Sequence, residues 1–113
     1  MRPRRPEQPA LLAQPLKCAK VGLALSMALM RRPRVLLLDE PSLGLAPAAV
    51  SKTFEYIVRL RDTWSLTVIV AEQKVNEVLA ISDRVCALRT GSVVFFGTPS
   101  EIQEPQRMRS VFL

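Results

Sequence analysis

The chain has 113 residues, of which 49% are hydrophobic and 23% are charged, and its formal net charge is +6. This length accommodates one modest hydrophobic core, and this composition is globular rather than disordered. The sequence contains no His, which excludes a His base and a His zinc ligand. Cys18 and Cys86 have no metal-binding spacing, and two isolated thiols of this kind are more often reduced than joined in a disulfide.

Basic charge is concentrated at the N-terminus. Residues 1–34 carry eight Lys or Arg and one Glu, whereas residues 35–113 carry eight Lys or Arg and nine Asp or Glu. Four of the nine prolines lie in residues 1–16, where they disfavour helix interiors and sheet ladders. We therefore predict a disordered arm over residues 1–20 and a folded region over residues 21–113. The arm could lie along nucleic acid or anionic lipid, but it lacks aromatic residues for base stacking, so a solvated tail is favoured and no nucleic-acid partner is expected.

The first predicted element is a helix over residues 17–31. Leu23, Met27 and Met30 are spaced to share one face of this helix, and Pro33 ends it. The apolar run within it is shorter than the ~20 residues that span a bilayer. A basic start followed by such a run also resembles a signal peptide, but arginines follow in place of a small-residue cleavage site, so we expect neither a signal peptide nor a membrane span.

Strands and helices then alternate. Residues 35–38 form a continuous apolar run, which predicts a strand buried on both faces. A helix follows from Pro47 to about residue 63, with apolar residues at helical spacing. Residues 66–71 predict a second buried strand, and residues 74–81 a second helix. Since a strand–helix–strand crossover joins parallel strands, the predicted fold class is α/β.

The C-terminal part predicts a closing β-hairpin. Strands over residues 84–89 and 92–97 meet at Thr90-Gly91, where Gly can supply the positive φ of a tight turn. Thr98 is a suitable N-cap and Pro99 a suitable first residue for a short terminal helix.

Candidate chemistry begins with Asp39 and Glu40, which follow the first apolar strand. The carboxyl end of a strand is the edge where α/β sheets bind ligands, and a carboxylate there can hold Mg²⁺ while its neighbour polarises a water. By themselves, an apolar run and an Asp-Glu pair are more often a strand whose end simply emerges into solvent.

The residues that follow identify a family. Leu38-Asp-Glu-Pro-Ser-Leu-Gly-Leu-Ala-Pro47 resembles the Walker B strand and D-loop of ABC ATPases, and is most similar to an ATPase subunit of branched-chain amino-acid importers. Val68-Ile-Val-Ala-Glu-Gln73 resembles the switch strand, in which this subfamily commonly has Gln in place of His. Segments near residues 81–84, 88–91 and 96–102 resemble the family's closing region, and the helix from Leu23 resembles the one that leads into Walker B.

The resemblance implies a partial P-loop ABC ATPase core, with ATP and Mg²⁺ as cofactors. Asp39 would position Mg²⁺ through water, Glu40 would polarise the attacking water, and Gln73 would contact the γ-phosphate. Ser42 and Gly44, in the D-loop, would contribute to cofactor binding, and that loop communicates across the dimer. The implied partners are a second ABC ATPase subunit and transmembrane permease subunits, at the cytoplasmic face of the cell membrane.

Two family motifs are missing from the 113 residues. The four glycines include no pair with P-loop spacing followed by Lys, so there is no Walker A motif, and residues 15–19 contain no Leu-Ser-Gly-Gly-Gln-like signature. We therefore expect a truncated or frame-disrupted ATPase subunit that is inactive as an isolated chain, with residues 1–20 outside the family sequence. An alternative is an ABC-type ATPase of DNA repair, but those relatives have His at the switch position and a Gly-rich closing segment. Another is a non-catalytic interaction module.

Overall fold

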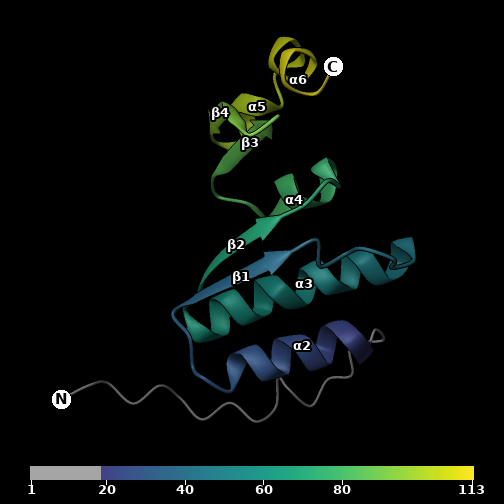
Figure 1. Ribbon diagram of the computed structural model, residues 1–113, viewed down its shortest axis with the longest axis vertical. Helices are drawn as coiled ribbons and strands as arrows, with labels where there is room; N and C mark the ends of the chain where they lie inside the picture. Colours follow the sequence, from purple (N-terminus) through teal and green to yellow (C-terminus); the bar gives the residue numbers. More distant parts are fainter. Residues whose placement is uncertain (1–18) are drawn as a thin grey trace, which may run out of the picture. The chain divides into compact units, whose positions relative to one another are not determined.

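The computed structural model describes residues 19–113, which form two compact units, the first ending at Gln73 and the second spanning Lys74–Leu113 (Figure 1). The predicted disordered arm falls largely on residues 1–18, which lie outside the described residues, as does Cys18. Cys86 is an exposed thiol. None of the described helices is long and apolar enough to cross a membrane.

The first unit contains two helices and two parallel strands. In chain order they are α2 (Ala19–Leu29), β1 (Val35–Asp39), α3 (Pro47–Trp64) and β2 (Thr67–Ala71). The two strands pair directly and in parallel, with α3 as the crossover between them, as the strand–helix–strand pattern predicts. Figure 1 shows α3 running along the strand pair, with α2 beside α3.

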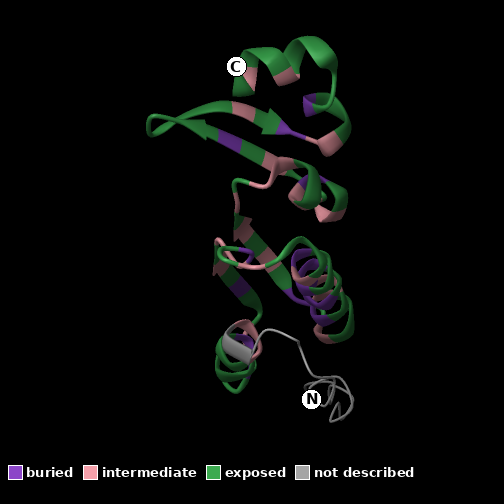
Figure 2. Ribbon diagram, turned by 90° about the vertical axis from the view of Figure 1, so that its right-hand side faces the viewer, coloured by how far each residue is buried: buried purple, intermediate pink, exposed green. Residues whose placement is uncertain are grey.

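The amphipathic helix α3 supplies most of the buried surface of this unit. Pro47 occupies its first turn, where the missing N–H costs no hydrogen bond. Figure 2 shows buried stretches along the ribbon of α3. The buried residues recur at helical spacing: Val50, Thr53, Phe54, Tyr56, Ile57 and Leu60. The predicted helix from Pro47 to about residue 63 is therefore confirmed.

The core of the first unit lies where α2, β1 and α3 meet. Its buried members come from all three elements and from the residue just before β2: Leu25, Leu29, Leu36, Tyr56, Leu60 and Leu66. Trp64, the only tryptophan of the chain, packs against this cluster. Burial raises the pKa of the Tyr56 hydroxyl, because the charged phenolate loses hydration.

The prediction that both strands are buried on two faces is wrong for the described residues. Leu36 is 4% exposed, but Leu37 is 70% exposed and Ile69 is 57% exposed. Successive side chains of a strand point to opposite faces, and α2 and α3 meet only the face that carries Leu36. Within the first unit, residues 19–73 supply no element that covers the opposite face.

The apolar face predicted for the first helix is also not the buried one. Leu23, Met27 and Met30 are 63%, 62% and 82% exposed, whereas Leu25 and Leu29 are buried in the core. This helix has apolar residues on two sides, so spacing alone could not select the side that packs.

The second unit is built around the closing hairpin. Its elements are α4 (Val75–Ile81), β3 (Val85–Arg89), β4 (Ser92–Gly97), α5 (Pro99–Ile102) and α6 (Pro105–Phe112). The two strands pair antiparallel as predicted, with a bulge between Ala87 and Leu88. The turn residues Thr90 and Gly91 have φ of 47° and 81°, the left-handed values that tight hairpin turns require.

Helices of the second unit pack on a small core of Leu79, Ala87 and Ile102. Met108 and Val111, both on α6, pack against it. The sequence predicted only one short terminal helix, so α6 was missed, although Pro105 at its first turn is a helix-start signal.

The start of α5 is a complete capping box. The Thr98 hydroxyl accepts from the Glu101 N–H, and the Glu101 carboxylate accepts from the Thr98 N–H at 2.7 Å. The Thr98 hydroxyl also donates to this carboxylate at 3.0 Å. The bonds that the carboxylate accepts, first from the backbone and then from the side chain of Thr98, lower the pKa of Glu101 below its ordinary value of 4.5. The predicted N-cap Thr98 and start at Pro99 are therefore confirmed.

Candidate functional site

The candidate site lies in the first unit, where β1 and β2 end side by side. Asp39 is the last residue of β1 and is paired in register with Ala71, the last residue of β2. The N–H of Glu40 donates to the Ala71 carbonyl at 2.8 Å, which extends the strand pairing by one residue. The carboxyl ends of both strands therefore meet at one edge, as the parallel arrangement predicts.

Two of the predicted site residues touch each other at this edge. The Gln73 Nε2 donates a hydrogen bond to the Glu40 Oε1 at 2.8 Å, although 33 positions separate the residues in the chain. Glu40 has φ of 44°, a left-handed value that is costly for a residue with a Cβ. Such strain is typical of functional sites, where the surrounding contacts hold the residue in place.

Ser42 and Gly44 lie in the loop that leaves this edge. Ser42 is 1% exposed, and Gly44 is exposed with φ of 75°. Main-chain bonds from Leu43 N–H to Glu40 carbonyl (3.0 Å) and from Leu45 N–H to Ser42 carbonyl (3.1 Å) shape the loop as successive turns. The loop is therefore an ordered extension of β1.

Glu72 is the site residue that sequence reasoning missed. One carboxylate oxygen, Oε1, accepts from the Ser42 N–H at 2.9 Å, and the other, Oε2, accepts from the Gln73 N–H at 3.1 Å. The available signal was its position directly after a strand, the same position that singled out Glu40 after the first strand.

This edge offers Asp39 as a carboxylate ligand for Mg²⁺, but not a complete set of protein ligands. Asp39 is exposed at the end of β1, so its carboxylate is open to a cation or to a water held by one. No group of three or more metal-ligating His, Cys, Asp or Glu side chains occurs in the described part of the chain. Mg²⁺ commonly keeps several waters and takes one or two protein carboxylates together with substrate phosphates, and Asp39 suits that role.

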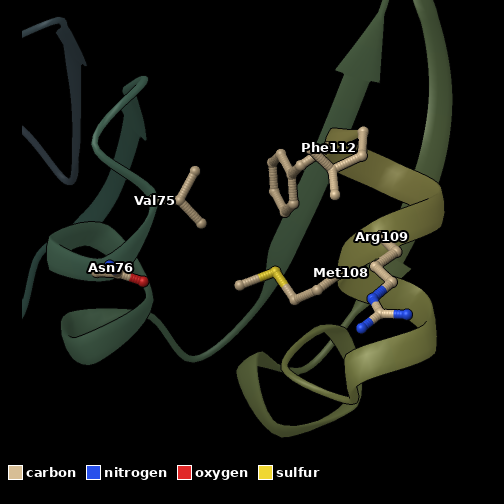
Figure 3. Close-up of a pocket in the computed structure, with 6 residues that line it drawn as sticks. Val75, Asn76, Met108, Arg109 and Phe112 are labelled. Atoms are coloured by element: carbon tan, nitrogen blue, oxygen red, sulfur yellow. The ribbon is translucent and has the colours of Figure 1, made fainter.

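A separate cavity lies within the second unit and brings none of the predicted site residues together. Its volume is about 300 Å³, and its lining is mostly apolar side chains of α4 and α6. Figure 3 shows Val75 facing Met108 and Phe112 across it, with the Arg109 guanidinium directed away. Asn76 is the one side-chain amide in its lining, and the lining includes no Asp or Glu. The candidate chemistry therefore stays in the first unit.

Curated relatives match most of the chain. Over 91 residues it is 41% identical to the high-affinity branched-chain amino acid transport ATP-binding protein BraG of Pseudomonas aeruginosa, covering 80% of this chain and 39% of the relative. It is 39% identical to a probable branched-chain amino acid transport ATP-binding protein, LivF, of Archaeoglobus fulgidus, covering 79% and 38%. The lipopolysaccharide export ATP-binding protein LptB of Escherichia coli also matches, at 34% identity, covering 79% and 36%. No family model matches the chain.

A solved structure shares the fold. The structure of cbiO1 from Clostridium perfringens, part of the ABC transporter complex cbiONQ, superposes with a TM-score of 0.70 and 31% identity. The match covers 80% of this chain and 36% of that one.

The described α/β fold, with a parallel strand pair and a closing antiparallel pair, is thus that of a partial ABC ATPase core. The chain is a homologue of ABC transporter ATP-binding proteins, and it spans about two fifths of the length of the curated relatives named above.

Proposed function

We propose that this chain provides the Walker B, D-loop and switch region of an ABC transporter ATPase subunit, in a transporter for branched-chain amino acids. The observation that carries the proposal is the hydrogen bond between Gln73 and Glu40, which joins the ends of two adjacent parallel strands. The identities of 41% and 39% to BraG and LivF support the amino-acid branch of the family.

In this function, Glu40 polarises the water that attacks the γ-phosphate. A carboxylate can accept a proton or a hydrogen bond from water, and the bond from Gln73 fixes the direction of one of its oxygens. Gln73 carries two N–H donors on Nε2, so the second donor can reach a phosphate oxygen while the first holds Glu40. An amide does not titrate near neutral pH, so Gln73 acts by positioning and not by moving a proton.

Asp39, at the end of β1, would hold Mg²⁺ through water. The ion, when bound with ATP, neutralises charge that develops on the phosphate oxygens. Ser42 and Gly44 belong to the loop that meets a second ATPase subunit in this proposal. The ordered turns of the loop would couple the position of that subunit to the end of β1. Glu40, Gln73 and Asp39 are thus the catalytic and cofactor-binding set of the proposal.

An ATP site needs further parts that the 113 residues do not contain. The 113 residues contain no P-loop spacing, and a phosphate cradle needs the converging N–H groups of such a loop. We propose a second ABC ATPase subunit and transmembrane permease subunits as partners, with the chain peripheral on the cytoplasmic face of the membrane. The 113-residue chain alone does not hydrolyse ATP in this proposal.

The test is a chimera in which residues 23–104 replace the matching segment of BraG. The expected result is ATP hydrolysis by the chimera, loss of at least about 100-fold in Glu40→Gln, and no hydrolysis by the 113-residue chain. Glu55→Gln, an exposed carboxylate on α3, is the matched control and leaves the rate unchanged. A chimera that is stabilised by ATP yet hydrolyses none, or hydrolysis that survives Glu40→Gln, would contradict the proposal.

The transported solute is tested separately, by sequencing the DNA on either side of the gene. Permease and amino-acid-binding-protein genes beside it would support a branched-chain amino-acid importer. Genes for lipid export or for another solute would move the chain to a different branch of the same family, without affecting the assignment of Glu40 and Gln73.

A further inference from the structure

Glu72 connects two segments that approach each other only in the folded chain. Its Oε1 accepts from the Ser42 N–H at 2.9 Å, and its Oε2 accepts from the Gln73 N–H at 3.1 Å. Ser42 is almost fully buried, at 1% exposure, and Glu72 is half-buried. Hydrogen bonds from N–H groups to an ionised carboxylate are stronger than neutral ones, and partial burial reduces competition from water.

Both bonds involve residues at or close in sequence to the Glu40–Gln73 contact. Ser42 is two residues beyond Glu40, and Gln73 directly follows Glu72. Direct β1–β2 pairing extends as far as the bond from Glu40 N–H to the Ala71 carbonyl, after which the left-handed backbone of Glu40 turns the chain into the loop. Beyond that point, the carboxylate of Glu72 ties the loop to the end of β2.

We propose that Glu72 is a positioning residue that holds the Gln73 side-chain amide against the Glu40 carboxylate. It acts by fixing the two backbones from which those side chains extend. Both are exposed or half-buried, so without this tie their 2.8 Å bond would compete with water and with the rotamers of a long Gln side chain. The catalytic meaning of this role rests on the proposed function, while the coupling itself is a property of this chain.

The test uses the ¹⁵N-labelled 113-residue chain and follows the Gln73 side-chain amide by NMR. In the wild-type background, Glu40→Ala removes the acceptor and shifts the Gln73 Nε2 resonances. In the Glu72→Ala background, the same Glu40→Ala change is expected to shift them little, because the contact is already lost. Hydrogen exchange of the Ser42 amide is expected to accelerate on the order of tenfold in Glu72→Ala.

Two further variants separate positioning from general loss of structure. Glu72→Gln keeps one carbonyl acceptor, so it should protect the Ser42 or the Gln73 amide but not both, and should restore part of the coupling. Glu55→Ala, an exposed carboxylate change on α3, should alter neither signal. Trp64 fluorescence reports whether the first unit is still folded in each variant.

Equal responses of the Gln73 amide to Glu40→Ala with and without Glu72 would overturn the proposal, as would unchanged exchange at Ser42. If Glu72→Ala does not fold, the comparison of Glu72→Gln with wild type decides. These measurements do not involve ATP, so a chimera that fails to hydrolyse ATP would contradict the proposed function and leave the coupling result standing.

Discussion

Several residues with side chains adopt left-handed backbone, and the reason differs between them. Glu40, with φ of 44°, lies in the candidate site, where its bonds to Ala71 and Gln73 hold the turn. Ser65, with φ of 50°, ends α3 as its C-cap, and the next N–H, that of Leu66, donates to the Arg61 carbonyl at 3.0 Å. The backbone strain at Glu40 lies in the candidate site. The backbone strain at Ser65 can be relieved by a substitution that keeps the main-chain hydrogen bonds at the end of α3.

Ser65→Gly is therefore expected to stabilise the chain by about 1 kcal/mol, since Gly adopts the left-handed conformation without a Cβ clash. Urea denaturation followed by circular dichroism measures the free energy of unfolding. The matched control is the reverse change, Gly44→Ser, which is expected to lower the stability. Nothing lies within 4 Å of a Cβ added at Gly44, so the lost stability would come from the φ of 75° alone. A lower stability for Ser65→Gly would contradict this reading of the helix end.

The capping box at α5 predicts a pH dependence. The pKa of Glu101 is lowered in the folded chain by the hydrogen bonds from Thr98, so its carboxylate favours folding when ionised. The stability difference between wild type and Glu101→Gln is thus expected to be complete above the ordinary pKa of 4.5, and to shrink as the pH falls through the lower folded value.

Thermal unfolding of both proteins over a series of acidic pH values measures this difference. Ser100→Ala, an exposed change on the same helix, is the control and should track wild type throughout. A difference between wild type and Glu101→Gln that is constant with pH would show that the lowered pKa does not contribute to stability.

At the scale of elements, helix α3 packs against α2 and β1 through the core of the first unit. Leu60 is completely buried in the core shared with α2 and β1. Met27 on α2 is a large apolar side chain of similar size, but it is 62% exposed. Comparing the stability lost on truncating each residue therefore separates the effect of burial from the effect of hydrophobicity.

Leu60→Ala is expected to cost about 2–5 kcal/mol, from lost apolar burial and the cavity that remains. Met27→Ala is expected to change stability by no more than about 0.5 kcal/mol, because its side chain already meets solvent. Denaturant unfolding monitored by Trp64 fluorescence gives both values, since Trp64 packs on the same core. Similar costs for the two changes would mean that α2 packs by its other face.

For the whole molecule, the prominent surface feature is the open face of the β1–β2 pair. Leu37 and Ile69 are register partners on this face, and both are exposed. An apolar sheet face beside unpaired strand edges favours association with other chains. The described residues thus present a surface suited to contact with further protein.

Leu37→Lys combined with Ile69→Lys is expected to reduce self-association of the 113-residue chain, because it places charge on that face at little cost in packing. Sedimentation over a range of protein concentrations measures the change. Leu43→Lys is the control, since Leu43 is 75% exposed in the loop and lies outside both strands. An equal effect of Leu43→Lys would show that added charge, and not this face, controls association.

Local signals in the sequence determined much of this protein. The helix from Pro47, the hairpin at Thr90-Gly91 and the cap at Thr98 depend on neighbouring residues, so spacing and turn chemistry were sufficient to predict them. The run from Leu38 to Pro47 indicated the family, which the homologues confirm. The roles of Asp39, Glu40, Gln73, Ser42 and Gly44 remain predictions.

Tertiary structure decided what depends on distant partners. Which face of β1 and of α2 is buried depends on the elements that reach it, and an apolar residue such as Leu37 or Met27 carries no information about that in its own spacing. The bond between Glu40 and Gln73, and the link from Glu72 to Ser42, exist because β1 and β2 pair in parallel and end together. The sequence could place each residue at the end of a strand, but only the pairing of those strands brings their side chains within hydrogen-bond distance.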